Sequence, residues 1–276
     1  MIRWGVFSKR LSVAPKGSKA CGKENVTVNL DRVIAVRNKK TVYRDGDKCI
    51  KVFSAEYSKA DILNEALNQA RIEETGLSIP KIIEVTTVEG QWAIVSEYIQ
   101  GKTLAQLMAE DEERRCEYID LLLEIQMGIH QKTCPLLSRL KDKMNRKIAM
   151  TDFDATTRFY LHNRLESMPK HKKVCHGDFN PANVIIAEDG TPYVIDWAHA
   201  TQGNASADVA RTYLMFWLNG DIFGAEYYLD GFCRKSGTDK EYVQSWLPIV
   251  AASQSVKGNA QEREFLESWV NLANYQ

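Results

Sequence analysis

The 276-residue sequence contains no hydrophobic run that approaches the roughly 20 residues needed to span a bilayer. Its N-terminus also lacks the short hydrophobic core and small-residue cleavage site of a signal peptide. The six cysteines are scattered without a Cys-x-x-Cys pair, so neither a disulfide framework nor a zinc site is expected. These absences predict a cytoplasmic protein with free thiols and no membrane partner.

The sequence also has no excess of charge of either sign. Lys and Arg together number 36, as do Asp and Glu, so the formal net charge is zero. No overall field therefore indicates nucleic acid as a partner. Positive charge does collect in residues 1–29, which we interpret as a solvated basic arm rather than a binding arm.

The pattern of hydrophobic residues predicts an α+β fold with two lobes. β-branched and hydrophobic runs at 33–36, 41–43, 49–53, 82–88 and 91–96 predict strands, and Asp45-Gly46 and Glu89-Gly90 predict two of the turns. A helix is expected over 58–75, after the capping pair Ser58 and Asp61. Residues 30–98 would thus form a small lobe with an antiparallel sheet and one helix, and residues 99–276 a larger, mostly helical lobe.

One stretch of the larger lobe carries the chemistry. It reads His-Gly-Asp-Phe-Asn-Pro-Ala-Asn over residues 176–183, and Ile-Asp-Trp follows at 195–197. Asp189-Gly190 between two β-rich runs predicts a hairpin with a two-residue turn, which would place Asn183 directly opposite Asp196. Side chains opposed in this way have Cβ atoms about 4.5–5.5 Å apart. An amide oxygen and a carboxylate would then hold one hard cation, with Asp178 as a second carboxylate nearby.

A lysine inside a predicted strand, Lys51, is unusual among the hydrophobic residues 49–53. It could simply alternate outward into solvent. Alternatively it faces a site that holds an anion, with Glu65 of the predicted helix as its partner and Glu73 or Glu74 as rivals. A strand lysine fixed by a helix glutamate is the arrangement with which protein kinases bind phosphates.

The 176–183 and 195–197 motifs, with the Gly-x-x-x-x-Asp-x-Ala pattern of residues 203–210, resemble the aminoglycoside phosphotransferase family. That family is similar to choline kinases and shares the bilobal protein-kinase-like fold. The resemblance implies a Mg²⁺-dependent kinase that transfers the γ-phosphoryl group of ATP or GTP to a hydroxyl. The acceptor would be a small molecule such as an amino sugar or an amino alcohol.

The resemblance also implies a role for each matching residue. Asp178 would be catalytic, and Asn183 and Asp196 would bind the metal. Lys51, held by Glu65, would bind the nucleotide phosphates, and the chain around Glu97 and Ile99 would bind the adenine. His176 and Asp208 would be structural. The loop between the first two strands has no glycine, which leaves Lys39 or Lys40 as a phosphate contact.

Two other functions fit parts of the sequence. A catalytically silent nucleotide-binding module would explain the glycine-free loop, but every chemical position holds a competent residue. A metal-dependent hydrolase using His176, Asp178, Asp196 and His199 would leave Lys51 without a task. For the acceptor, Glu262, Glu264 and Glu267 would either attract a cationic molecule or form a solvated helix face. The sequence gives no indication of oligomeric state.

Overall fold

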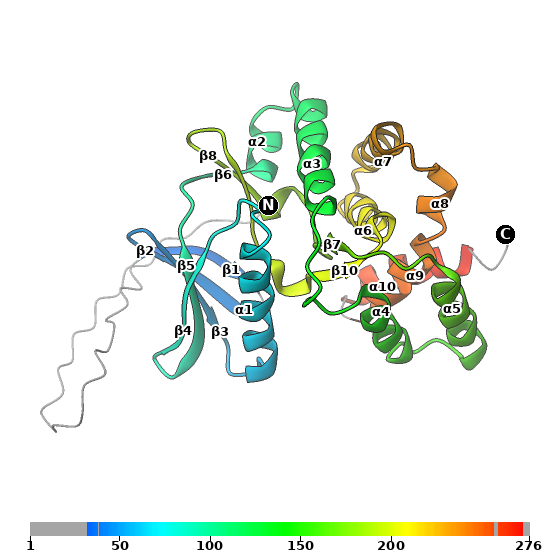
Figure 1. The fold of residues 1–276 in the computed structure, drawn as a ribbon, viewed down its shortest axis with the longest axis horizontal. Helices are drawn as coiled ribbons and strands as arrows, with labels where there is room; N and C mark the ends of the chain where they lie inside the picture. The colour runs from blue at the N-terminus through cyan, green and yellow to red at the C-terminus, as the bar shows by residue number, and fades with distance from the viewer. Residues whose placement is uncertain (1–31, 38, 257–258, 273–276) are drawn as a thin grey trace, which may run out of the picture. The chain divides into compact units, whose positions relative to one another are not determined.

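A computed structural model describes residues 32–37, 39–256 and 259–272 (Figure 1). The described chain divides into two compact units. The first ends at Ile62 and resumes over Ile83–Tyr98, whereas the second contains Leu63–Ile82 and the chain from Ile99 onward. The predicted basic arm, residues 1–29, lies outside the described residues. The lobes predicted at 30–98 and 99–276 stay a proposal.

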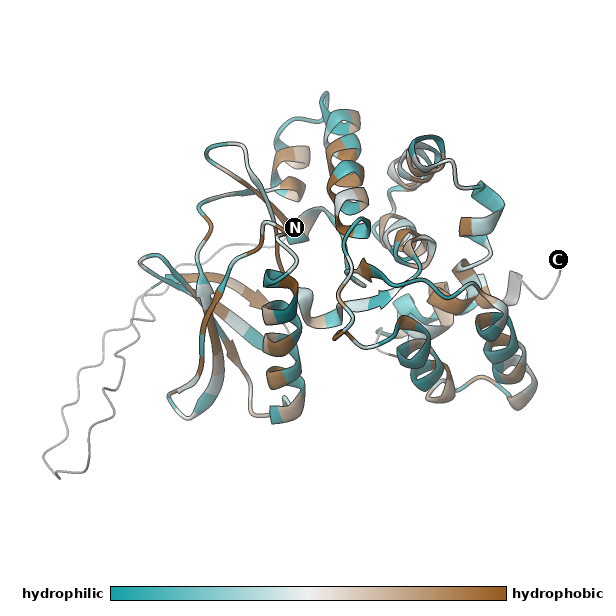
Figure 2. Ribbon diagram, viewed as in Figure 1, coloured by the Kyte–Doolittle hydropathy of each residue, from teal (hydrophilic) through white to brown (hydrophobic). Residues whose placement is uncertain are grey.

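The first unit is built on a five-stranded antiparallel sheet with strand order β1-β2-β3-β5-β4 (Figure 1). Its strands are β1 (Arg32–Arg37), β2 (Lys40–Asp45), β3 (Lys48–Phe53), β4 (Ile82–Val88) and β5 (Gln91–Glu97). All five match the predicted strands. In β3 the alternate residues Ile50 and Val52 are buried, and they pack with Val95 of β5 in a hydrophobic cluster. Much of β5 is accordingly hydrophobic in Figure 2.

Turn residues explain how the strands connect. The predicted turn between β4 and β5 is confirmed at Glu89 and Gly90. Both residues have positive φ, 50° and 79°, as a turn with two left-handed central residues requires. The turn between β2 and β3 differs by one residue from the prediction, because Asp45 pairs with Lys48. Its central residues are therefore Gly46 and Asp47. Gly46, with φ of 59°, takes the first central position, where type II′ turns require glycine.

Helix α1 (Lys59–Glu73) begins in the first unit and continues in the second. Ser58 caps it by accepting a hydrogen bond from Asp61 N–H at 3.1 Å. Its later part is tied to the second unit by two hydrogen bonds, from Asn68 Nδ2 to Ala198 O (3.4 Å) and from Gln69 Nε2 to Pro80 O (2.7 Å). These long-range contacts explain why the helix is shared between units, which the sequence did not predict.

The second unit is mostly helical, as predicted. Its helices are α2 (Leu104–Glu110), α3 (Arg115–His130), α4 (Leu140–Ala149), α5 (Ala155–Ser167), α6 (Ala205–Leu218), α7 (Ile222–Ser236), α8 (Lys240–Gln244), α9 (Leu247–Ser255) and α10 (Ala260–Leu272). Short strands lie between them: β6 (Gly101–Thr103), β7 (Lys173–Cys175), β8 (Val184–Ala187), β9 (Pro192–Val194) and β10 (Thr201–Gly203). Two single 3₁₀ turns lie at the ends of the two motif segments: η1 (Pro181–Asn183) closes the first, and η2 (Trp197–His199) begins at the last residue of the second.

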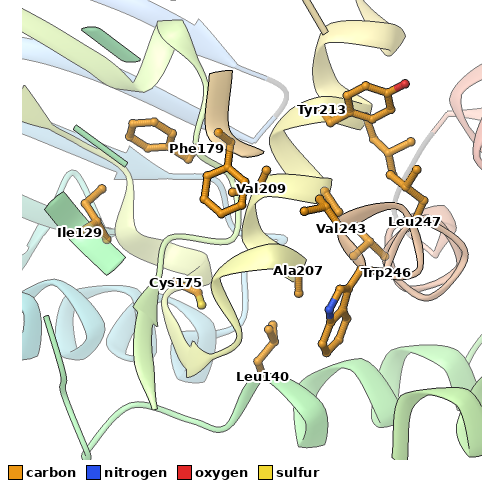
Figure 3. Close-up of a cluster of buried hydrophobic side chains, with 14 of the residues drawn as sticks. Ile129, Leu140, Cys175, Phe179, Ala207, Val209, Tyr213, Val243, Trp246 and Leu247 are labelled. Carbon is orange, nitrogen blue, oxygen red and sulfur yellow. The ribbon is translucent and has the colours of Figure 1, made fainter. Parts of the chain in front are cut away.

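One large hydrophobic core holds these elements together. Buried side chains from α3, α4, α6 and the chain around α8 and α9 meet in it, and Leu140, Ala207 and Trp246 point toward one another in Figure 3. Phe179 and Cys175, on either side of the His176–Asp178 segment, are also fully buried in this core. The loop that carries Asp178 is therefore fixed at both ends by burial. Among the described residues no helix is long and hydrophobic enough to cross a membrane.

The hairpin of β8 and β9 has a different register from the predicted one. Val184 pairs with Val194, and Ala187 N–H donates to Thr191 O at 3.0 Å. The loop thus has three residues, 188–190, instead of two. Asp189 Oδ1 accepts from Thr191 N–H, and Gly190 has φ of 84°, a combination that closes a three-residue hairpin. The predicted direct opposition of Asn183 and Asp196 is therefore wrong by one residue.

Candidate active site

His176 follows β7 and is fully buried. Its Nδ1 accepts a hydrogen bond from Asp178 N–H at 3.2 Å, and its Nε2 lies 3.0 Å from Ile195 O. Because a backbone N–H can only donate and a carbonyl can only accept, His176 is a neutral imidazole with its proton on Nε2. Both ring nitrogens are occupied, so His176 has no nitrogen left for the metal that a hydrolase would bind.

Asp208, on the first turn of α6, accepts hydrogen bonds from four donors. Two are the backbone N–H groups of His176 (3.1 Å) and Gly177 (2.7 Å). The others are Gln126 Nε2 (3.2 Å) and His130 Nε2 (3.0 Å), both on α3. Burial by itself would raise the pKa of Asp208, but the hydrogen bond and charge of His130, with the hydrogen bond from the Gly177 N–H, lower the pKa below its usual value. An ionised carboxylate thus fixes the backbone just before Asp178.

Asp178 is held in one orientation by two side chains. Arg211 Nη2 lies 3.2 Å from Asp178 Oδ1, and Asn183 Nδ2 lies 3.4 Å from Asp178 Oδ2. Asn183 Nδ2 also donates to the backbone oxygen of Asp178 at 2.9 Å. The carboxylate of Asp178 remains 26 % exposed, so a bound molecule can reach it. It combines a fixed orientation with access from outside.

The donor atoms at Asn183 and Asp196 suit a hard cation. Asn183 is buried, and since its Nδ2 faces Asp178, its Oδ1 is turned away and has no hydrogen-bond partner among the described residues. Asp196 has left-handed backbone angles (φ 63°, ψ 61°), which cost an L-residue roughly 1–3 kcal/mol and persist mainly at functional sites. Ile195 N–H, one residue before it, donates to Asn183 O at 2.9 Å. An orphaned amide oxygen and a carboxylate at the same end of one hairpin fit Mg²⁺, which takes its remaining ligands from water or phosphate.

The described residues contain no group of three or more His, Cys, Asp or Glu side chains arranged to hold a metal. The two ligand candidates, Asn183 and Asp196, would therefore need further oxygen ligands from water or from a substrate to bind a metal. Cys175, beside the motif, is buried, and burial raises the pKa of its thiol well above the usual value. It packs in the hydrophobic core.

The predicted nucleotide-binding residues are divided between the two units. Lys51 lies on β3 between Val42 and Ile94 of the neighbouring strands, and its side chain is half-buried. Glu65 is buried on the part of α1 that belongs to the second unit. Their pairing stays a prediction, as does adenine binding by Glu97 and Ile99. Lys39 forms an exposed ion pair with Glu56 (3.0 Å).

Lys40, the other phosphate candidate, lies over two aromatic rings of its own unit. Its Nζ is 5.3 Å from the ring centre of Phe53 and 5.4 Å from that of Tyr57. Such cation–π contacts favour a conformation in which the Lys40 side chain lies along the surface of the sheet. A phosphate contact by Lys40 also stays a prediction.

Sequence reasoning missed Arg211, His130 and Gln126. Arg211 could have been found, because residues three apart on a helix lie on one face, and Asp208 and Arg211 are so spaced on α6. Gln126 and His130, four apart on α3, are likewise on one face. Nothing local indicates that this face meets Asp208, which lies 78 residues beyond His130.

Comparison with known proteins gives a family. The profile of the phosphotransferase enzyme family (APH) matches residues 34–246. No curated protein sequence matches the chain.

Solved structures of phosphotransferases share the fold. A thermostable mutant of aminoglycoside phosphotransferase APH(4)-Ia, in a ternary complex with ADP and hygromycin B, has 15 % identity and a TM-score of 0.64. The similarity covers 87 % of this chain and 91 % of that one. Choline kinase LicA from Streptococcus pneumoniae has 15 % identity and a TM-score of 0.60, over 89 % of this chain and 93 % of that one. At these identities the similarity shows a shared fold. It does not assign the substrates of those proteins to this chain.

Proposed function

Since this chain belongs to the phosphotransferase enzyme family, we propose that it is a kinase that transfers the γ-phosphoryl group of ATP or GTP to a hydroxyl of a small molecule. The observation that carries the proposal is the loop at Asp178. It presents one oriented, accessible carboxylate beside an amide oxygen, Asn183 Oδ1, that is buried without a partner in the part of the chain that the structure describes. Amino sugars, amino alcohols and related metabolites are the first acceptor classes to test.

Asp178 is the proposed catalytic residue. Its carboxylate would accept a hydrogen bond from the acceptor hydroxyl and align the oxygen with the γ-phosphorus. The acceptor oxygen forms the new P–O bond, and the bond from the γ-phosphorus to the β,γ-bridging oxygen breaks. The hydroxyl proton passes to Asp178 and then to solvent. Transfer of this kind is largely dissociative, so the proton moves late and alignment is the main task.

Asn183 and Asp196 are the proposed metal-binding residues. Asn183 contributes its free Oδ1, and Asp196 contributes a carboxylate from a strained left-handed position. The Mg²⁺ that they would hold neutralises charge on the β- and γ-phosphate oxygens. His176 and Asp208 would support these residues without contacting substrate. This role is favoured by their hydrogen bonds to the backbone, from His176 Nε2 to Ile195 O and from Gly177 N–H to Asp208 Oδ1.

Lys51 is the proposed phosphate-binding residue of the first unit, oriented by Glu65. Glu97 and Ile99 would bind the nucleotide base through their main chain. Lys39 and Lys40 are further phosphate candidates, of which Lys39 is already in an ion pair with Glu56.

The proposal is tested first by nucleotide binding. A ligand that binds only the folded protein raises its unfolding midpoint in proportion to RT ln(1 + [L]/Kd). We expect ATP or GTP to raise the thermal midpoint when Mg²⁺ is present, and to do so less when the metal is chelated. No shift with either nucleotide would contradict the proposal.

Two variants then separate the two carboxylates. Asp178→Ala should retain the nucleotide-induced shift and lose ADP release with any active acceptor, by a factor of 10³ or more on the scale of lost alignment and proton acceptance. Asp196→Ala should weaken the shift itself. Asp142→Ala, at an exposed position of α4, is the control and should change neither. Equal loss of nucleotide binding in both site variants would mean that the roles are assigned wrongly.

A further inference from the structure

A small cavity of about 30 Å³ lies beside Arg211 in the second unit. It is enclosed by one face of α4, the Gly177 segment, α6 and α9. Polar side chains in its wall include Lys143 and Lys147 of α4, Arg211 of α6, and Ser253 and Gln254 of α9. Its volume is enough for one or two waters or a single polar group of a larger molecule.

Arg211, a lining residue of the cavity, has hydrogen-bonding capacity left over. Its Nη2 is used by Asp178, but its Nε and Nη1 are buried and have no hydrogen-bond partner within the described chain. Buried N–H groups are rarely left unpaired, because desolvation without a partner is costly. An acceptor oxygen in the cavity would satisfy them.

The charge of the cavity wall has one dominant sign. Lys143 and Lys147 are four residues apart, so they share one face of α4, and like charges at that spacing repel. The single carboxylate among the described lining residues is Asp208, which already accepts from four donors. Lys143 Nζ also donates to His199 O at 2.9 Å, which holds its ammonium at this wall.

One further carboxylate acts on Arg211 from outside the cavity wall. Burial lowers the pKa of Arg211, and the charges of Asp178, Glu262 and Asp208 oppose that lowering without cancelling it. Glu262 Oε1 itself accepts from Asn259 Nδ2 at 2.9 Å, at the start of α10. Among the described lining residues, the side chains with a formal charge are thus Lys143, Lys147 and Arg211, with Asp208 as the carboxylate.

We propose that this cavity binds an anionic group of the acceptor, a carboxylate or a phosphate, through Lys143, Lys147 and Arg211. The inference rests on the proposed kinase activity and names its substrate class: a small hydroxy compound with a negative charge. Arg211 contacts Asp178 with one nitrogen and also lines the cavity, so it would place the anion next to the residue that orients the carboxylate receiving the hydroxyl proton. A cationic acceptor drawn by Glu262, Glu264 and Glu267 is the opposite expectation.

The first experiment measures ADP release with acceptors matched in carbon skeleton. One set is glycerate, glycerol phosphate, glycerol and serinol, and a second is gluconate, glucose 6-phosphate, glucose and glucosamine. We expect turnover with the carboxylate member or the phosphate member of a set. Which of the two is turned over shows whether the cavity binds a carboxylate or a phosphate. Turnover confined to neutral or amino members would overturn this inference and leave the kinase activity standing.

The second experiment tests the cavity without turnover, by the effect of inorganic phosphate on the thermal midpoint in the absence of nucleotide. Phosphate should stabilise the wild-type protein and Lys141→Gln but not Lys147→Gln. Lys141 is the control because it lies on the same helix, outside the cavity wall, and donates to Glu166 O. Equal phosphate stabilisation of the two variants, or none in the wild type, would show that the cavity holds water only.

Kinetics of Lys147→Gln complete the test. Because Lys147 does not contact Asp178, its replacement should raise KM for the anionic acceptor about tenfold or more and leave kcat within about twofold, the pattern of lost ground-state binding. An unliganded midpoint equal to that of the wild type confirms that the variant is folded. Failure of nucleotide binding would refute the kinase proposal, whereas the phosphate arm judges the cavity independently.

Discussion

At the scale of single residues, Gly177 is the most constrained position of the candidate site. Its φ of 79° lies in the left-handed region, and a Cβ there would meet the backbone oxygen of His199 at 2.7 Å. Both its N–H bond to Asp208 and its place before Asp178 depend on this conformation. A side chain would therefore disturb the loop directly.

We predict that Gly177→Ala lowers the free energy of unfolding by about 2–4 kcal/mol, since backbone strain of 1–3 kcal/mol is joined by a contact with rigid backbone. Loss of ADP release should accompany it. Gly190→Ala is the matched control, because Gly190 also has positive φ (84°) but nothing lies within 4 Å of the added Cβ. Equal destabilisation of the two variants in urea unfolding would contradict the steric part of the argument.

The buried carboxylate of Asp208 should make the stability of the folded protein sensitive to acid. Its pKa is lower in the folded protein than in the unfolded chain, where it is about 3.9. The unfolded chain therefore takes up the proton first on acidification. The stabilisation from Asp208 is fully present above the unfolded pKa and is lost as pH falls through the lower, folded pKa.

We predict that Asp208→Asn costs about 3–5 kcal/mol at pH 7, the scale for breaking a buried charged network. The gap in unfolding free energy between the wild type and Asp208→Asn should stay constant from pH 7 to about 5 and narrow below about pH 4. Urea titrations at each pH measure it, with Asp142→Asn as an exposed control. A gap that widens on acidification would show that the carboxyl is not ionised in the folded protein.

At the scale of elements, the capping residues decide where the helices near the site begin. Thr103 Oγ1 accepts from Gln106 N–H at 3.2 Å, and Gln106 Oε1 accepts from Thr103 N–H at 2.8 Å, and together these two bonds form the capping box of α2. Asn204 caps α6 by accepting from Ser206 N–H at 2.9 Å. The Asn204 cap fixes the first turn of α6, which carries Asp208.

Replacing the cap of α2 gives a test at this scale. Thr103→Ala should lower the free energy of unfolding by about 1 kcal/mol, because the Gln106 N–H loses its partner. Thr103→Ser keeps a hydroxyl at the same place and should lower the free energy of unfolding by at most a few tenths of a kcal/mol. Helix content and the denaturation midpoint together measure the effect, and equal loss in both variants would point to packing of the lost methyl instead.

The β8–β9 hairpin shows the limit of element prediction. The β-rich runs and the turn region were read correctly from sequence, but loop length sets the register. Asp189 Oδ1 binds the Thr191 N–H and so favours a three-residue loop over the two-residue turn that Asp-Gly indicated. A change of one residue in the loop shifted the whole pairing, and with it the partner of Asn183, which is Ile195.

At the scale of the whole molecule, the α+β class and the order of elements follow from the sequence. Period-two hydrophobic runs define the sheet of the first unit, and their inward residues Ile50 and Val52 form its core. Longer helical patterns define the second unit. Its core joins residues as distant as Ile129 and Trp246, and the sequence does not reveal which helix faces meet there.

The sequence by itself determined the fold class, the family motifs and the candidate residues Asp178, Asn183 and Asp196. Local patterns sufficed for these because periodicity, caps and spacing are properties of neighbouring residues. Tertiary structure decided what surrounds them: the four donors to Asp208, the Arg211 contact to Asp178 and the basic cavity beside it. Those features depend on side chains from separate helices, whose meeting is set by how hydrophobic faces pack and not by any local run of residues.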